Sequence, residues 1–157
     1  MTSEAATKFV YTTYISTTPE KIWQAITRPE IARQYWVHQN VSDWKVGSKW
    51  EHVRGDDGSV MLAGKVIESV PPRKLVITWG EAADYPNEAK HTRVTFELEP
   101  IGEMVRLTVT HDELKAGSDM ASSIANGWPR VLSSLKSLLE TGKPLDTWAQ
   151  PKGRINQ

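Results

Sequence analysis

The chain has 157 residues with 19 basic and 19 acidic side chains, so its net charge is zero and no overall field draws it to nucleic acid or anionic lipid. The lack of cysteine excludes disulfides and thiolate chemistry. The start, MTSEAATK, is polar, and no apolar run approaches the roughly 18 residues of a membrane span. These features predict one cytoplasmic domain over 1–157, with an ordered core over about 8–145 and a loosely held tail over 147–157.

The first predicted elements are a strand and two short helices. The segment 9–16, FVYTTYIS, is rich in β-branched and aromatic residues, which favours a strand. In 17–27, TTPEKIWQAIT, Thr18 can cap a helix whose first position suits Pro19. The segment 29–36, PEIARQYW, opens with a second proline and predicts another short helix. We therefore expect a helix pair directly after the first strand.

From residue 44 the apolar period changes to two, as in Val94 and Phe96, which indicates strands with one apolar and one polar face. Asp57-Gly58 favours a tight hairpin turn. Together with the first strand, these strands form an antiparallel sheet of about six strands that is covered on one side only. The predicted strands are 44–54, 59–70, 74–81, 91–100 and 103–112.

The last element is a long amphipathic helix after a loop over 112–119. Its apolar side chains keep one phase, at about 100° per residue, from 119 to 141. Gly127 and Pro129 are helix breakers inside this stretch, and we expect a kink at Pro129 because proline removes a backbone hydrogen bond. Gly142 suits a left-handed cap. A sheet with one apolar face needs a cover, and this helix is the only element long enough to provide it.

Six segments match the pattern of a known family in the same order. They are STTPEKIWQAITRPEIARQYW (16–36), DWKVGSKW (43–50), GKVIESVPPRKLVITW (64–79), TRVTFELEP (92–100), RLTVTHDEL (106–114) and GWPRVLSSLKSLLETG (127–142). The chain resembles the heat-shock protein 90 ATPase activator homologue family, in the START-like (SRPBCC, birch-pollen-allergen-like) superfamily. It departs from that pattern at Gly47-Ser48, where two glycines are common, and at Pro129. The resemblance implies an α+β helix-grip fold, in which a curved antiparallel sheet wraps the C-terminal helix around a cavity.

No motif identifies catalytic or metal-binding machinery. The four histidines lie at none of the helical or hairpin spacings of a metal site. Ser133 and Lys136 match a Ser-x-x-Lys pattern of some acyl enzymes, but the helical wheel places both away from the apolar stripe, so we interpret the match as chance. The sequence therefore predicts no metal, no cofactor and no catalytic residue.

One histidine has an informative position. His111 continues the apolar series Val105, Leu107 and Val109, so it should point toward the covered face of the sheet. Two interpretations stay open at this stage. His111 is either a strand-end residue bonded to a loop carbonyl, or a hydrogen-bonding or proton-transferring group for a molecule inside the cavity.

The tryptophan content points to a pocket. The chain has seven tryptophans against two phenylalanines, and indoles rarely pack away completely. Core filling is the simpler interpretation of any single tryptophan, and the pattern leaves open whether the cavity is filled by its own indoles. The predicted ligand-binding residues are Trp36, Trp50, Trp79, Phe96, His111, Ile124, Trp128 and Val131.

Three functions follow from these observations. The leading hypothesis is a protein that binds a hydrophobic, aromatic or polyketide-like small molecule between sheet and helix, as a monomer or homodimer. The second, implied by the resemblance alone, is a module that interacts with a chaperone. The third is a cyclase or hydrolase that uses pocket groups such as His111. One fold hosts many functions, so the fold does not decide among them.

Overall fold

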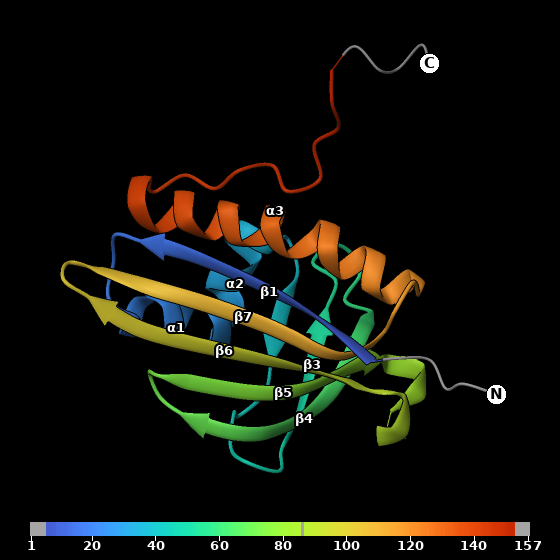
Figure 1. Cartoon of the computed structure of the whole chain (residues 1–157). Helices are drawn as coiled ribbons and strands as arrows, with labels where there is room; N and C mark the ends of the chain where they lie inside the picture. The colour runs from blue at the N-terminus through green and yellow to red at the C-terminus, as the bar shows by residue number, and fades with distance from the viewer. Residues whose placement is uncertain (1–5, 86, 153–157) are drawn as a thin grey trace.

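The computed structural model describes residues 6–85 and 87–152 (Figure 1). Two short helices follow the first strand and a long helix follows the last, as predicted. None of the helices in the described ranges is long and apolar enough to cross a membrane. The strands are β1 (Ala6–Ile15), β2 (Gln39–Val41), β3 (Lys49–Val53), β4 (Val60–Val70), β5 (Lys74–Glu81), β6 (Thr92–Ile101) and β7 (Met104–Lys115); the helices are α1 (Pro19–Thr27), α2 (Pro29–Trp36) and α3 (Asp119–Thr141), with 3₁₀ turns at Ala82–Asp84 and Glu88–Lys90.

The strands form one antiparallel sheet in the order β1-β7-β6-β5-β4-β3-β2. This is seven strands rather than the predicted six or so. The additional strand, β2, has three residues and pairs with β3, and it is too short for an alternating pattern to reveal it.

Several strand boundaries differ from the prediction, and β1 for example begins at Ala6 rather than at 9. β3 begins at Lys49 rather than at 44, because Trp44 (φ 60°) and Gly47 (φ 91°) have backbone conformations that a strand does not contain. β3 and β4 form the predicted hairpin, closed by a hydrogen bond from the Arg54 N–H to the Ser59 carbonyl at 2.9 Å, and Gly58 has the expected positive φ (74°). β7 continues to Lys115, where a loop was predicted, and its Leu114 is buried.

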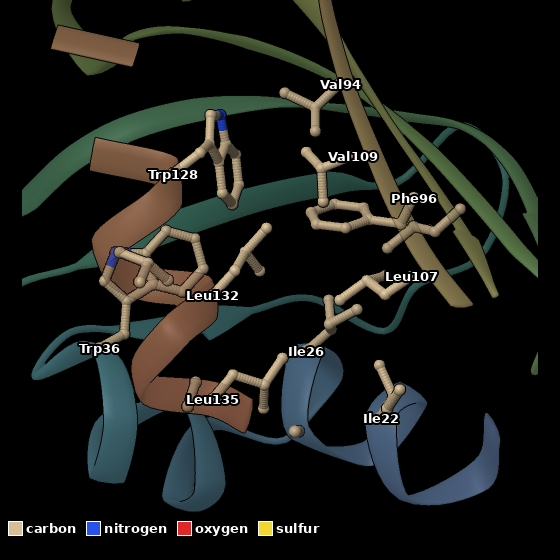
Figure 2. Packing of buried hydrophobic residues seen from close by; sticks show 14 of the residues in the cluster. Ile22, Ile26, Trp36, Val94, Phe96, Leu107, Val109, Trp128, Leu132 and Leu135 are labelled. Carbon is tan, nitrogen blue, oxygen red and sulfur yellow. The ribbon is translucent and has the colours of Figure 1, made fainter. Parts of the chain in front are cut away.

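All three helices pack against the same face of the sheet (Figures 1 and 2). In Figure 2, Leu132 and Leu135 of α3 lie opposite Ile22 and Ile26 of α1 and Leu107 of β7. These side chains belong to one buried apolar cluster, as the alternation along the strands predicts. The arrangement confirms the α+β helix-grip fold.

The prediction of a sheet covered on one side only does not hold at β5. In β5, Val76 and Thr78 are buried as well as Leu75 and Ile77, so this strand is buried on both faces. On the outer face, the Thr78 hydroxyl lies 3.2 Å from Nδ1 of His91. The local departure arises because the segment after β5 folds back over the strand.

Helix α3 is continuous through both helix breakers. Ser118 caps its start, accepting a hydrogen bond from the Ala121 backbone N–H at 3.1 Å. Gly127 and Pro129 lie inside the helix, and Gly142 ends it in the left-handed conformation with φ 84°. The single helix and its cap are therefore confirmed, while a kink at Pro129 stays a prediction.

The segment after α3, which we call the C-terminal strap (residues 143–150), runs back along the helix (Figure 1). The Ser134 hydroxyl donates to the Leu145 carbonyl at 3.1 Å and accepts from its N–H at 3.0 Å. Arg130 donates to the carbonyls of Thr147 and Ala149 at 3.1 and 2.9 Å. The prediction of a loosely held tail is therefore wrong for 147–149, and residues 153–157 lie outside the described ranges.

Candidate functional site

A cavity of about 530 Å³ lies between the N-terminal half of α3 and the part of the sheet that contains β3, β4 and β5. Most of its lining is aromatic or aliphatic. Its rim includes two exposed carboxylates, Glu81 and Asp119, and the half-exposed indole of Trp148. The lining residues are Trp36, His38, His52, Met61, Leu62, Trp79, Glu81, Asp119, Met120, Ser123, Ile124, Gly127, Trp128, Val131 and Trp148.

Four tryptophans from four separate elements form one cluster beside this cavity. Trp128 of α3 lies 5.5 Å from both Trp36 of α2 and Trp79 of β5, measured between ring centroids. Trp50 of β3 lies 5.3 Å from Trp79. Phe96 of β6 meets Trp128 edge-on at 5.8 Å. Trp36 and Trp79 lie nearly parallel with centroids 6.5 Å apart, while the other pairs are tilted or edge-on, and aromatic pairs favour offset and edge-on arrangements over direct face-to-face stacking.

The predicted ligand-binding residues divide into two groups. Trp36, Trp79, Ile124, Trp128 and Val131 line the cavity. Trp50, Phe96 and His111 lie behind this layer and are buried, with exposed fractions of 3% or less. Trp50 is held there by a 2.6 Å hydrogen bond from its Nε1 to the Thr78 carbonyl. That any of these residues binds a ligand stays a prediction.

His111 points to the covered face and supports Trp128. The Trp128 Nε1 donates to His111 Nδ1 at 3.1 Å, so neutral His111 carries its proton on Nε2. The Nε2–H group donates a hydrogen bond to the Thr92 hydroxyl at 2.6 Å. The Thr92 hydroxyl in turn donates to the Trp79 carbonyl at 3.0 Å. Burial lowers the pKa of His111 to about 3. Its partners are two side chains rather than a loop carbonyl, and both ring nitrogens are engaged within the protein.

His52 is a buried histidine that the sequence reasoning did not select. Its ring lies 4.7 Å from Trp36 and 6.1 Å from Trp79, again between centroids. Nδ1 lies 2.8 Å from the Asn40 side-chain oxygen. Burial is the larger cause and the nearby His38 the smaller cause that together lower the pKa of His52 to about 3. A signal was present, because His52 lies two residues after Trp50 on one strand and so shares its face.

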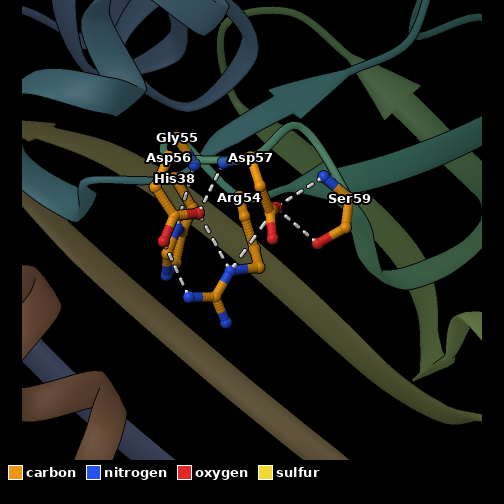
Figure 3. A network of polar contacts seen from close by, with 6 residues as sticks. All are labelled: His38, Arg54, Gly55, Asp56, Asp57 and Ser59. Carbon is orange, nitrogen blue, oxygen red and sulfur yellow. Dashed lines mark hydrogen bonds and ion pairs between the residues drawn. The ribbon is translucent and has the colours of Figure 1, made fainter.

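His38 lies at the mouth of the cavity, against the turn between β3 and β4 (Figure 3). The Gly55 backbone N–H donates to its Nδ1 over a long 3.4 Å contact. Arg54 binds Asp56 with two hydrogen bonds of 3.0 and 2.9 Å, which closes the turn. The pKa of His38 is lowered, first by burial and then by the Arg54 charge.

The C-terminal strap completes the mouth. It carries Trp148, whose ring lies 6.3 Å from His38 and whose exposed fraction is 49%. No sequence pattern marks Trp148 as a cavity residue, because its position depends on main-chain contacts between the strap and α3. Within the described ranges, no three His, Cys, Asp or Glu side chains form a group that could hold a metal ion.

A sheet wrapped round a C-terminal helix, with a cavity at one end of the grip, defines a START-like helix-grip protein. Residues 16–140 match the family model described as "Activator of Hsp90 ATPase homolog 1-like protein". The chain belongs to this family, as the six sequence segments predict.

Several solved structures are similar to the chain. The Aha1 dimer from Colwellia psychrerythraea is 26% identical with a TM-score of 0.72, covering 87% of this chain and 98% of that one. Protein MLL2253 from Mesorhizobium loti is 28% identical with a TM-score of 0.71, covering 85% and 96%. PFC0360w, an HSP90 activator from Plasmodium falciparum, is 25% identical with a TM-score of 0.69, covering 84% and 95%. A search of curated proteins finds no match.

Proposed function

We propose that the protein binds an uncharged, hydrophobic aromatic molecule in the cavity under the N-terminal half of α3. The observation that carries this proposal is the cavity itself, about 530 Å³ of mostly apolar space walled by Trp36, Trp79 and Trp128. Small-molecule sites commonly have volumes of about 300–1,000 Å³ and few polar groups. The carboxylates of Glu81 and Asp119 at the rim disfavour an anionic ligand.

The walls of the cavity are held in place before any ligand arrives. Trp128 is fixed by its hydrogen bond to His111, and Trp50, behind Trp79, is fixed by its bond to the Thr78 carbonyl. A buried indole that moved to fill the cavity would leave its N–H without a partner, which is costly. A preorganised aromatic wall stacks on a planar ligand without first losing side-chain freedom.

The test uses the uncharged fluorescent probe N-phenyl-1-naphthylamine, whose emission rises when it leaves water. Gly127 lines the cavity, and a Cβ added there meets no atom within 4 Å, so Gly127→Leu projects a side chain into free space. We expect this variant to bind the probe about tenfold or more weakly, because its leucine occupies the ligand volume.

The matched control is Asn126→Leu, which adds an apolar side chain at an exposed neighbouring position of the same helix that does not line the cavity. Its probe affinity should stay within about twofold of the original protein. Equal affinity in the Gly127 and Asn126 variants, or no probe binding by the unmodified protein, would contradict the proposal.

A second candidate function is interaction with a chaperone. Family membership and the 25% identity to an HSP90 activator from Plasmodium falciparum favour it. It predicts that the purified protein changes the ATPase rate of heat-shock protein 90 in a dose-dependent way. An unchanged rate at saturating concentration would set this candidate aside. A cytoplasmic site of action is part of both proposals.

A further inference from the structure

We infer that the cavity selects aromatic ligands that carry a hydrogen-bond donor, such as a phenolic hydroxyl, and that Nε2 of His52 is the acceptor for that donor. The inference rests on the proposed function and adds the chemistry of the ligand to it. A chain of hydrogen bonds leads from the Ile26 carbonyl through Asn40 to His52, which lines the cavity.

The first step is the orientation of the Asn40 amide, which is buried. Its nitrogen Nδ2 donates to the Ile26 carbonyl at 3.0 Å, at the end of α1. A flipped amide would place its oxygen against that carbonyl oxygen, which is repulsive. The Asn40 side-chain oxygen is therefore the atom that faces His52.

The second step is the tautomer of His52. The Asn40 oxygen can only accept, so His52 Nδ1, at 2.8 Å, must carry the proton. A neutral imidazole has one N–H, and so Nε2 presents a lone pair. The neutral form is the stable one here, because burial lowers the pKa of His52 to about 3.

The third step is the access to Nε2. Among the residues that the structure describes, Nε2 of His52 has no hydrogen-bond partner, and it is not among the unpaired polar atoms that are sealed from solvent. His52 lines the cavity. The buried His111, by contrast, uses both ring nitrogens inside the protein. The exposed side chains of Glu81, Asp119 and Ser123 also line the cavity, but Nε2 of His52 is an acceptor of fixed polarity on a buried residue of the described wall.

A hydrocarbon that fills the cavity takes water away from this acceptor and returns nothing, whereas a hydroxyl or N–H group satisfies it. A phenolate cannot donate, and its negative charge would face the lone pair. The ligand class is therefore a neutral aromatic donor.

The experiment compares 1-hydroxypyrene with 1-methoxypyrene and pyrene by fluorescence titration at neutral pH. The hydroxy and methoxy probes share the same ring system and oxygen atom, but only the hydroxy probe has an O–H group to donate. We expect the unmodified protein to bind 1-hydroxypyrene about tenfold more tightly than 1-methoxypyrene, the usual effect of one hydrogen bond. The advantage should vanish when the pH is raised until the hydroxyl of the probe ionises.

In His52→Leu the ratio of the two affinities should fall to about one, while pyrene binding changes by less than about threefold. His52→Gln is the rescue variant, because its amide can donate to Asn40 and present an oxygen to the cavity, so the ratio should be restored. His111→Phe is the control. It disturbs Trp128 and weakens all three probes together, which leaves the ratio unchanged.

The outcomes distinguish failure of the inference about His52 from failure of the proposed function. Equal binding of the hydroxyl and methoxy probes by the unmodified protein overturns the inference and leaves the proposed function standing. A uniform loss for all three probes in His52→Leu assigns His52 a structural role and also overturns the inference. No binding of any probe overturns the proposed function and the inference with it. If His52→Leu does not fold, the His52→Gln variant and the pH series decide.

Discussion

The two halves of helix α3 make opposite uses of the same apolar stripe. In the C-terminal half, Leu132 and Leu135 pack against Ile22 and Ile26 of α1, and this end of the grip is closed (Figure 2). In the N-terminal half, Ile124 and Trp128 face the cavity, as does Gly127. A continuous amphipathic helix can therefore carry solid core along one half and the wall of an open cavity along the other.

The difference comes from what lies opposite each half. In the C-terminal half, the leucines of α3 share one buried apolar cluster with the branched aliphatic side chains of α1, and such close-packed side chains fill space efficiently. Opposite the N-terminal half, the strands present large rigid indoles, and Trp50 and Trp128 are tied by hydrogen bonds to Thr78 and His111. These rings cannot shift to close a gap without breaking those bonds. The hydrogen bonds of Trp50 and Trp128 therefore oppose collapse of the cavity.

The largest expected effect is a difference in the free energy of unfolding between substitutions in the two halves of α3. Leu135→Ala removes a fully buried side chain from the closed end and should lower the free energy of unfolding by about 2–5 kcal/mol, because it creates a new void. Ile124→Ala removes a similar volume beside space that is already open, and should cost less. Urea unfolding followed by circular dichroism measures both. An equal or larger cost for Ile124→Ala would contradict the distinction between the halves.

Acid should destabilise the fold through two buried histidines, His52 and His111. His52 and His111 ionise near pH 6.5 when unfolded, but burial lowers the pKa of each to about 3 in the fold. The unfolded chain therefore binds more protons between these values, so stability rises with pH and is lost as pH falls. The loss should approach about 1.4 kcal/mol per pH unit for each histidine below pH 6.5. His38, whose pKa is also lowered, adds in the same direction.

The histidine effect can be isolated between pH 6.5 and 5, above the range in which most carboxylates titrate. Urea midpoints across this window should fall for the unmodified protein. The double variant His52→Gln, His111→Gln, although less stable at neutral pH, should show a much flatter profile. A flat profile in the unmodified protein would show that its buried imidazoles do not resist protonation.

The smallest effect concerns Gly127. Replacing a helical glycine by alanine stabilises a helix by about 0.5–1 kcal/mol when the new methyl group meets no obstacle. The space around Gly127 is free, so Gly127→Ala should raise the melting temperature slightly. The same methyl group projects into the cavity and should weaken probe binding. Calorimetry and probe titration together test this opposition, and it fails if both stability and affinity rise.

Most of the fold could be predicted from local patterns. Alternation located the longer strands, and Pro19 and Gly142 mark helix ends through their backbone preferences. The short β2 and the irregular backbone at Trp44 have no such pattern, since pairing with β3 and a hydrogen bond from Trp44 Nε1 to the Thr27 carbonyl determine them. Sequence periodicity therefore does not predict segments whose conformation depends on tertiary contacts.

The cavity residues likewise divide into those that sequence periodicity predicts and those that depend on tertiary contacts. Trp128 and Ile124 could be predicted because the helical period places them on the inner face. His111 was placed on the correct face, but its partners lie on other elements and no pattern names them. His38 comes from a turn, and Trp148 comes from a strap whose path depends on contacts with Arg130 and Ser134.

The attachment of the C-terminal strap has a consequence for how such a protein changes over generations. Arg130 and Ser134 grip main-chain carbonyls, which every amino acid possesses. The side chain at position 148 can therefore be exchanged without undoing the attachment, and the strap lies beyond the 16–140 region shared with the family. The strap's share of the cavity mouth, the side chain at position 148, can therefore change without loss of the hydrogen bonds that attach the strap to α3.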